Sequence, residues 1–140
     1  MAYHPYLFFG GNCREAFTRY HEIFGGDLTL LTAADMPAEQ RPPEDTGDMI
    51  MHAALVGDGG ALLMGSDDPT TDSFGPVQGM QVNFATPDVD EAKRVFAALA
   101  DGGTVHVEPS DTGWSPYFGM LSDRFGTPWM IGADAADQAG

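Results

Sequence analysis

The stretch MQVNFATPDVDEAKRVFAALADGG, residues 80–103, decides the fold, because the chain carries its pattern twice. Residues 81–85 predict a short strand, and Asp88 is a typical N-cap for the helix that follows, with Glu91 at the third position of a capping box. Gly102-Gly103 then ends the helix, and 104–108 predicts the next strand. Between the cap and the glycines, apolar residues recur at helical spacing: Ala92, Val95, Phe96, Leu99 and Ala100.

The same signals occur near the start of the chain. HPYLFF (4–9) predicts a strand, Asn12 is the candidate N-cap, and Glu15 completes the box. The two caps lie 76 residues apart (88 − 12), as do the two glutamates (91 − 15). The first apolar stripe, which Gly25-Gly26 ends, consists of Ala16, Phe17, Tyr20, Ile23 and Phe24. Several local signals at one offset predict an internal duplication.

Both halves continue in the same way. Strands are expected at 27–33, 48–56 and 61–67, with a GDGG hairpin at 57–60, and again at 104–108, 114–121 and 127–132, with a polar turn at 122–126. Each half is therefore a β-α-β-β-β module, about 4–67 and 78–132, and the predicted class is α+β. A single module would expose one sheet face, so we expect both modules to form one domain spanning 1–140.

Two segments stand outside this pattern. Residues 33–48 are acidic, rich in proline and without period, which predicts a long surface loop and suggests a mobile cover as its role. Residues 133–140 are expected to be a frayed tail.

Composition excludes several partners. Twenty-one acidic residues face six Lys and Arg, a formal net charge of −15, so neither nucleic acid nor an anionic membrane surface is an expected partner. No run of about 18 apolar residues and no secretory leader is present, which favours a cytoplasmic protein. Cys13 is the only cysteine, so an intrachain disulfide and a multi-cysteine zinc site are excluded.

Three stretches carry a family resemblance: PYLFFGGNCREAFTRY (5–20), MHAALVGDGGALLMGSD (51–67) and GWSPYFGMLSDRFGTPWMI (113–131). With the tandem module, they resemble the vicinal oxygen chelate superfamily of glyoxalases, bleomycin-resistance proteins and dioxygenases, and more narrowly its PhnB-like branch. The resemblance implies two modules whose curled mixed sheets surround a shared cleft, usually within a homodimer. That branch often carries a demethylubiquinone methyltransferase label. Here GDGG joins two strands rather than a strand and a helix, so no nucleotide-type cofactor is expected.

Metal-dependent relatives place ligands on the first and fourth strands of each module. The resemblance puts these positions at Pro5, Met64, Gln81 and Met130, and only the amide of Gln81 offers a ligand for a hard divalent ion. The sequence therefore predicts neither metal nor cofactor.

A register shift by one residue would place His4 at the first of these positions. Because neighbouring strand residues face opposite sides, the shift would also turn Tyr6 and Phe8 into the cleft. We expect both aromatic residues beneath the helix, so the unshifted register is preferred.

Strand parity predicts which residues line the cleft. One set should share that face (Pro5, Leu7, Leu62, Met64, Gln81, Asn83, Pro128 and Met130), and a second should face the helices (Val82, Phe84, Trp129 and Ile131). Trp114, Tyr117 and Phe118 can stack on a flat ligand or pack between the modules. The candidate ligand-binding residues are Leu7, His52, Leu62, Met64, Gln81, Asn83, Trp114, Tyr117, Phe118 and Met130.

Individual residues leave alternatives open. His52 is the best candidate for a hydrogen-bonding or catalytic role, against a purely structural half-buried histidine. Met64 and Met130 either line the pocket or fill the core. His106 has no expected partner, and Asp67 and Asp123 are read as turn residues.

Three functions follow. The first is a metal-free protein that binds a small, partly apolar molecule. The second is a glyoxalase- or dioxygenase-type enzyme with atypical ligands, or one that uses His52 and Gln81 without metal. The third is a dimeric protein without a ligand.

Overall fold

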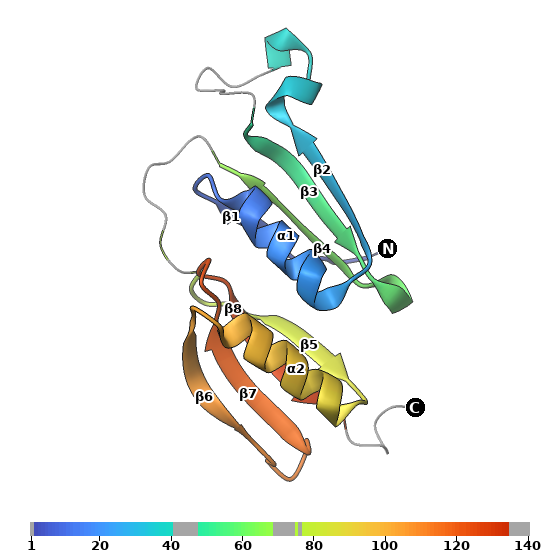
Figure 1. Ribbon diagram of the computed structural model, residues 1–140, viewed down its shortest axis with the longest axis vertical. Helices are drawn as coiled ribbons and strands as arrows, with labels where there is room; N and C mark the ends of the chain where they lie inside the picture. Colours follow the sequence, from blue (N-terminus) through green and yellow to red (C-terminus); the bar gives the residue numbers. More distant parts are fainter. Residues whose placement is uncertain (1, 41–47, 69–74, 76, 135–140) are drawn as a thin grey trace. The chain divides into compact units, whose positions relative to one another are not determined.

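The computed structural model describes residues 2–40, 48–68, 75 and 77–134 and divides into two compact units, Met1–Phe74 and Gly75–Gly140. In each unit a single helix lies across one face of a four-stranded sheet (Figure 1). No helix in the described parts of the chain is long and apolar enough to cross a membrane.

The first unit has the strand order β1-β4-β3-β2, in which β1 and β4 are parallel and the other neighbours antiparallel. Its elements are β1 (Tyr6–Phe9), α1 (Cys13–Phe24), β2 (Asp27–Thr32), β3 (Ile50–Val56) and β4 (Leu62–Asp67), with short 3-10 turns at Ala33–Asp35, Ala38–Gln40 and Asp58–Gly60. The predicted GDGG hairpin between β3 and β4 is confirmed. The predicted loop at 33–48 begins with two of these turns, and its residues 41–47 lie outside the described residues.

The second unit repeats this topology as β5-β8-β7-β6. Its elements are β5 (Val82–Thr86), α2 (Val89–Ala100), β6 (Thr104–Ser110), β7 (Tyr117–Ser122) and β8 (Pro128–Ala133). Helices α1 and α2 have the same length, and their bounds differ by 76 residues at both ends (89 − 13 and 100 − 24). The α+β class and the repeated β-α-β-β-β module are thus confirmed. Most of the predicted tail, 135–140, lies outside the described residues.

The core of each unit lies between the helix and the sheet. The fully or almost fully buried side chains of the helices are Cys13, Ala16, Phe17, Tyr20 and Ile23 in α1, and Ala92, Val95, Phe96 and Leu99 in α2. In both units one helix ring packs on a strand glycine. A Cβ atom at Gly65 would lie 2.7 Å from the Phe17 ring, and one at Gly119 would lie 2.7 Å from the Phe96 ring. Glycine at these positions lets the helix approach the sheet closely.

The helix caps differ between the units. In α2 the Asp88 side chain accepts hydrogen bonds from the backbone N–H groups of Asp90 and Glu91, as predicted. In α1 Asn12 occupies the predicted N-cap position, but its side chain makes no capping hydrogen bond, so the predicted capping box is wrong. The carboxylate of Asp67 takes this role. Asp67 is the last residue of β4, so its prediction as a turn residue is wrong.

Asp67 Oδ1 accepts from the backbone N–H groups of Gly11 (3.1 Å) and Cys13 (3.0 Å). Its Oδ2 accepts from the N–H of Ile50 at 3.0 Å. Asp67 is buried, so these bonds satisfy donors that water cannot easily reach. One side chain therefore connects the start of α1, the end of β4 and the start of β3.

Candidate functional site

The sheet of the first unit has one face under α1 and one open face, and β1 shows which residues belong to each. Leu7 is 3% exposed and lies beside Gly65, which faces Phe17 of the helix, whereas Phe8 is 57% exposed. Tyr6 and Phe8 therefore lie on the open face, and the prediction that they pack beneath the helix is wrong. The expectation that Leu7 shares a face with Met64 is wrong for the same reason, since Met64 pairs with Tyr6.

The open face is built from rows of residues that cross the strands. Tyr6 pairs with Met64, Met64 with Ala54, and Ala54 with Thr29, so one row crosses all four strands. The next row contains the pairs Phe8–Ser66 and Leu31–His52. The predicted site residues His52, Leu62 and Met64 lie on this face by their strand parity, and all three are partly buried.

A hydrogen bond between side chains crosses this face. Tyr6 Oη and His52 Nδ1 lie 3.1 Å apart, and their rings are 5.7 Å apart and tilted by 31°. Since β4 lies between β1 and β3, the pair bridges over β4. The Phe8 ring lies 5.2 Å from that of Tyr6, so the bridge borders an aromatic surface. Sequence reasoning singled out His52 but missed Tyr6, because it assigned Tyr6 to the other face.

The four family metal positions can now be placed. Pro5 shares the parity of Leu7, so the residue before β1 that shares the parity of the open face is His4. Tyr6 and Phe8 already lie on that face, so their orientation does not exclude His4, contrary to the prediction. The other three positions, Met64, Gln81 and Met130, still offer two thioethers and one amide, which do not suit a hard divalent ion. Within the described residues no group of three or more His, Cys, Asp or Glu could hold a metal ion.

The second unit follows the predicted parity. Trp129 and Ile131 are almost completely buried under α2, and they pair with Val82 and Phe84 of β5, as expected. On the other face, Asn83 pairs with Met130 and Met130 with Met120. Met130 and Met64 therefore occupy matching central places on the open faces, and neither belongs to the core under a helix. Gln81 is exposed and directly precedes β5.

Two of the three predicted stacking residues lie together. The rings of Trp114 and Phe118 are 4.7 Å apart and inclined by 61°, and Trp114 is 57% exposed. Tyr117 points to the other side, where its ring meets Phe96 of α2 edge-on at 6.3 Å. Burial, with a smaller contribution from Glu108, raises the pKa of Tyr117. Tyr117 is therefore part of the packing around α2 and does not share a face with Phe118.

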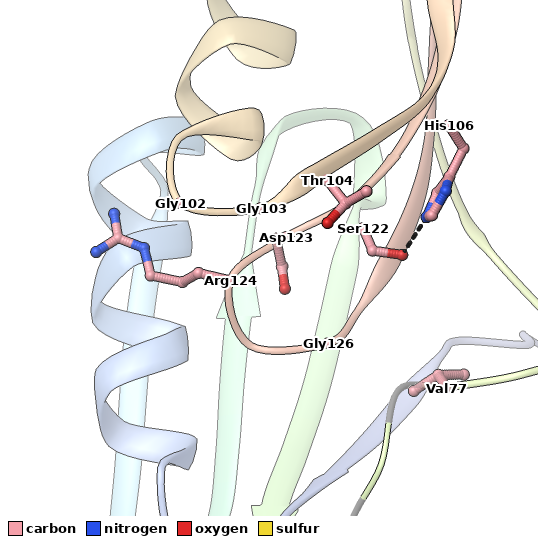
Figure 2. Close-up of a pocket in the computed structure, with 9 residues that line it drawn as sticks. All are labelled: Val77, Gly102, Gly103, Thr104, His106, Ser122, Asp123, Arg124 and Gly126. Carbon is pink, nitrogen blue, oxygen red and sulfur yellow. Dashed lines mark hydrogen bonds between the residues drawn. The ribbon is translucent and has the colours of Figure 1, made fainter.

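The second unit also has an open groove of about 490 Å³ that the sequence did not predict (Figure 2). It is lined by Val77, Gly102, Gly103, Thr104, His106, Ser122, Asp123, Arg124 and Gly126. His106 Nε2 lies 2.8 Å from Ser122 Oγ, so the expectation that His106 has no partner is wrong. The contact arises where the pairing of β6 with β7 shifts after Val105, an irregularity that leaves no clear sequence signal.

The carboxylate of Asp123, beside this groove, has a structural role. Oδ1 accepts from the backbone N–H groups of Phe125 and Thr127, and Oδ2 accepts from Trp129 Nε1 at 3.0 Å. Asp123 is buried and closes the turn between β7 and β8 onto the core. Its prediction as a turn residue is confirmed, but no local pattern of residues indicated the tryptophan contact.

Cys13 is not a nucleophile in this fold. Its side chain is fully buried, and burial, assisted by the nearby Asp67 carboxylate and opposed by Arg14, raises the pKa of the thiol from 9.0 to about 12. The reactive thiolate is therefore absent at neutral pH.

We expect native protein at pH 8 to resist 5,5′-dithiobis(2-nitrobenzoate), whereas unfolded protein should release one equivalent of the coloured thiolate per chain. Between pH 9 and 12 the unfolded chain loses the thiol proton and the folded chain keeps it, so the free energy of unfolding should fall as pH rises. Cys13→Ala should flatten that part of the profile. Rapid labelling of the folded protein would contradict this account.

Comparison of the sequence with known families identifies the class of protein to which this fold belongs. Residues 2–131 match the Glyoxalase/Bleomycin resistance protein/Dioxygenase superfamily, and the chain belongs to this superfamily. The resemblance found in the sequence is thereby confirmed.

Individual relatives extend over nearly the whole chain. Protein PA1353 from Pseudomonas aeruginosa is 41% identical, and its crystal structure covers 96% of this chain and 98% of its own with a TM-score of 0.86. Protein YjdN from Escherichia coli K12 is 29% identical over 138 residues, 94% of each chain. The PhnB protein from Bacillus cereus is 21% identical and shares the fold, with a TM-score of 0.75 over 95% of this chain and 99% of its own.

Proposed function

We propose that the protein is a PhnB-like member of the superfamily that binds a small, partly apolar molecule without a metal ion. The observation that carries the proposal is the Tyr6–His52 hydrogen bond on the open face of the first sheet. Apolar side chains, Phe8 and Met64 among them, surround this polar pair. A mostly apolar surface with a few fixed polar groups is the usual composition of a small-molecule site.

The chemistry of the ligand positions supports the absence of metal. Superfamily enzymes need several ligands to hold a divalent ion for Lewis-acid catalysis, and these positions supply only the imidazole of His4 and the amide of Gln81 besides two thioethers. Met64 and Met130 instead place thioethers at the centre of each open face. The residues present do not fit the metal centre of the family, so we assign it no role.

In the first unit we propose that the site comprises His52, Leu62 and Met64 of the predicted set, with Tyr6 and Phe8. Gln81, Asn83, Trp114, Phe118 and Met130 of the second unit stay predicted candidates. Leu7 and Tyr117 are left out because they face the helices. That both units form one domain around a shared cleft, within a cytoplasmic homodimer, stays a prediction.

Fragment screening by NMR tests this proposal. Protein carrying ¹³C-labelled methionine methyl groups should show saturable shifts of the Met64 signal with planar, partly apolar fragments, unchanged by EDTA. Met64→Leu assigns that signal, and Phe8→Ala should weaken binding about fivefold, since removing a ring costs about 1 kcal/mol or more of contact. Stoichiometric retention of Mn, Ni, Zn or Fe(II) after purification without chelator, or fragment binding that requires one of them, would refute the proposal.

A further inference from the structure

We infer that the first unit selects uncharged planar molecules over anionic ones by donating a hydrogen bond from the Tyr6–His52 pair to a carbonyl-type oxygen. This inference rests on the proposed function and names the ligand class of the same site. It depends on three features of the open face: how the pair shares its protons, the placement of charges, and two neighbouring aromatic rings.

The pair always has a proton left to donate. With the phenol O–H of Tyr6 donating to Nδ1 of neutral His52, the imidazole keeps an N–H at Nε2. With Nδ1–H donating to the phenol oxygen instead, Tyr6 keeps its own O–H. Either arrangement leaves one donor at the bridge, and a ligand oxygen that accepts it adds a hydrogen bond without disturbing the Tyr6–His52 contact.

Ser66 supplies a second polar group beside the bridge. It is 6% exposed, lies next to Phe8 across the β1–β4 ladder, and shares the strand parity of Met64. Its hydroxyl group can both donate and accept a hydrogen bond, so it is a further polar group that a ligand on this face can reach.

The charges around this face disfavour an anionic ligand. The described Lys and Arg residues of the first unit are Arg14 and Arg19, and both belong to α1, which covers the opposite face. The charged residues that share the parity of the open face are acidic, Asp27 at the start of β2 and Asp68 just after β4. A carboxylate or phosphate would therefore lose its hydration without gaining a cationic partner.

The flat shape of the ligand follows from the aromatic residues. Tyr6 and Phe8 place two rings 5.2 Å apart on this face, and exposed Phe8 offers its surface to stacking. Ala54 lies in the same row as Tyr6 and Met64, and its small side chain leaves room above the sheet for a ligand. A planar molecule can thus cover Met64 and bring an oxygen to the bridge.

Three naphthalene probes separate these contributions. They are 2-acetylnaphthalene (uncharged, with a carbonyl), 2-ethylnaphthalene (no oxygen) and 2-naphthoate (anionic). At pH 7.5, 2-acetylnaphthalene should shift the Met64 methyl and His52 ring signals and bind about fivefold more tightly than 2-ethylnaphthalene, as one added hydrogen bond predicts. It should also bind more tightly than 2-naphthoate, whose carboxylate finds no cationic partner on this face.

Two variants and a matched control complete the experiment. Tyr6→Phe keeps the ring but breaks the bridge, so it should abolish the preference for 2-acetylnaphthalene over 2-ethylnaphthalene while 2-ethylnaphthalene binds as before. His52→Ala should abolish the same preference. His106→Ala, which breaks the analogous histidine–hydroxyl contact of the second unit (Figure 2), should leave it unchanged.

The outcomes also distinguish this inference from the proposed function. Equal binding of the acetyl and ethyl probes, a preference that survives both variants, or tightest binding of the anionic probe would overturn the inference, while shifts at Met64 would still support the proposed function. No saturable shift at Met64 or His52 with any probe would overturn both.

Discussion

Replacing Asp67 with alanine should lower the free energy of unfolding by about 4 kcal/mol, one of the two largest effects expected for a single substitution in this chain. The carboxylate accepts hydrogen bonds from three backbone N–H groups, those of Gly11, Cys13 and Ile50. Each buried donor left unpaired costs about 1–3 kcal/mol, and partial access of water reduces the sum. Urea denaturation followed by circular dichroism measures the loss.

Two further variants isolate the cause. Asp67→Asn keeps one acceptor oxygen in the same shape, so it should cost about half as much as alanine. Asp58→Ala removes the same charge from an exposed turn and should change stability by less than about 0.5 kcal/mol. Equal effects of Asp67→Ala and Asp58→Ala would mean that the hydrogen bonds contribute nothing beyond net charge.

Replacing Gly26 with alanine is expected to lower the free energy of unfolding by more than about 3 kcal/mol. Gly26 has a φ of +83°, and a Cβ atom there would lie 2.3 Å from the carbonyl oxygen of Val56. Val56 is the partner of Asp27 in the β2–β3 ladder, so relief of the clash would separate these strands at their first pair.

The neighbouring glycine provides the control. Gly25 has a similar φ of +71°, but nothing lies within 4 Å of a Cβ atom built there. Gly25→Ala therefore reports the cost of the backbone conformation alone, about 1 kcal/mol, and the difference between the variants reports the clash. Both variants can be compared by thermal and urea unfolding. Equal stabilities would contradict the close approach of Gly26 to the carbonyl oxygen of Val56.

The repeated module was predictable because its signals are local. Caps, helix stripes and glycine ends recur at one offset, and each depends on residues within a single element. The parity of β5 was also readable, since Asn83 alternates with Val82 and Phe84.

The sequence does not show which side chains of β1 face the helix, and the reason is physical. Its four residues, YLFF, are all aromatic or aliphatic, so alternation gives no sign of which side faces the helix. The register with Met64 and Gly65 decides it, and that pairing joins residues far apart in sequence. This single ambiguity produced the errors at Leu7, Tyr6 and His4, and it hid the Tyr6–His52 bridge.

The remaining errors concern contacts between distant segments. Asp67 lies 54 residues from Cys13, whose N–H it accepts, and His106 meets Ser122 across a shifted ladder. No local propensity encodes such contacts, because the partners become neighbours only when the sheet has formed.

The two ways of capping the helices have a consequence for the order of folding. Helix α2 has its own cap, Asp88, within three residues of the N–H groups that it satisfies, so its first turn can be stabilised as soon as the segment leaves the random coil. Helix α1 lacks this local nucleus and depends on a loop closure of more than fifty residues to Asp67. Although they are copies of one motif, the first helix should acquire its stable end only after the last strand of its unit has docked, whereas the second can form on its own.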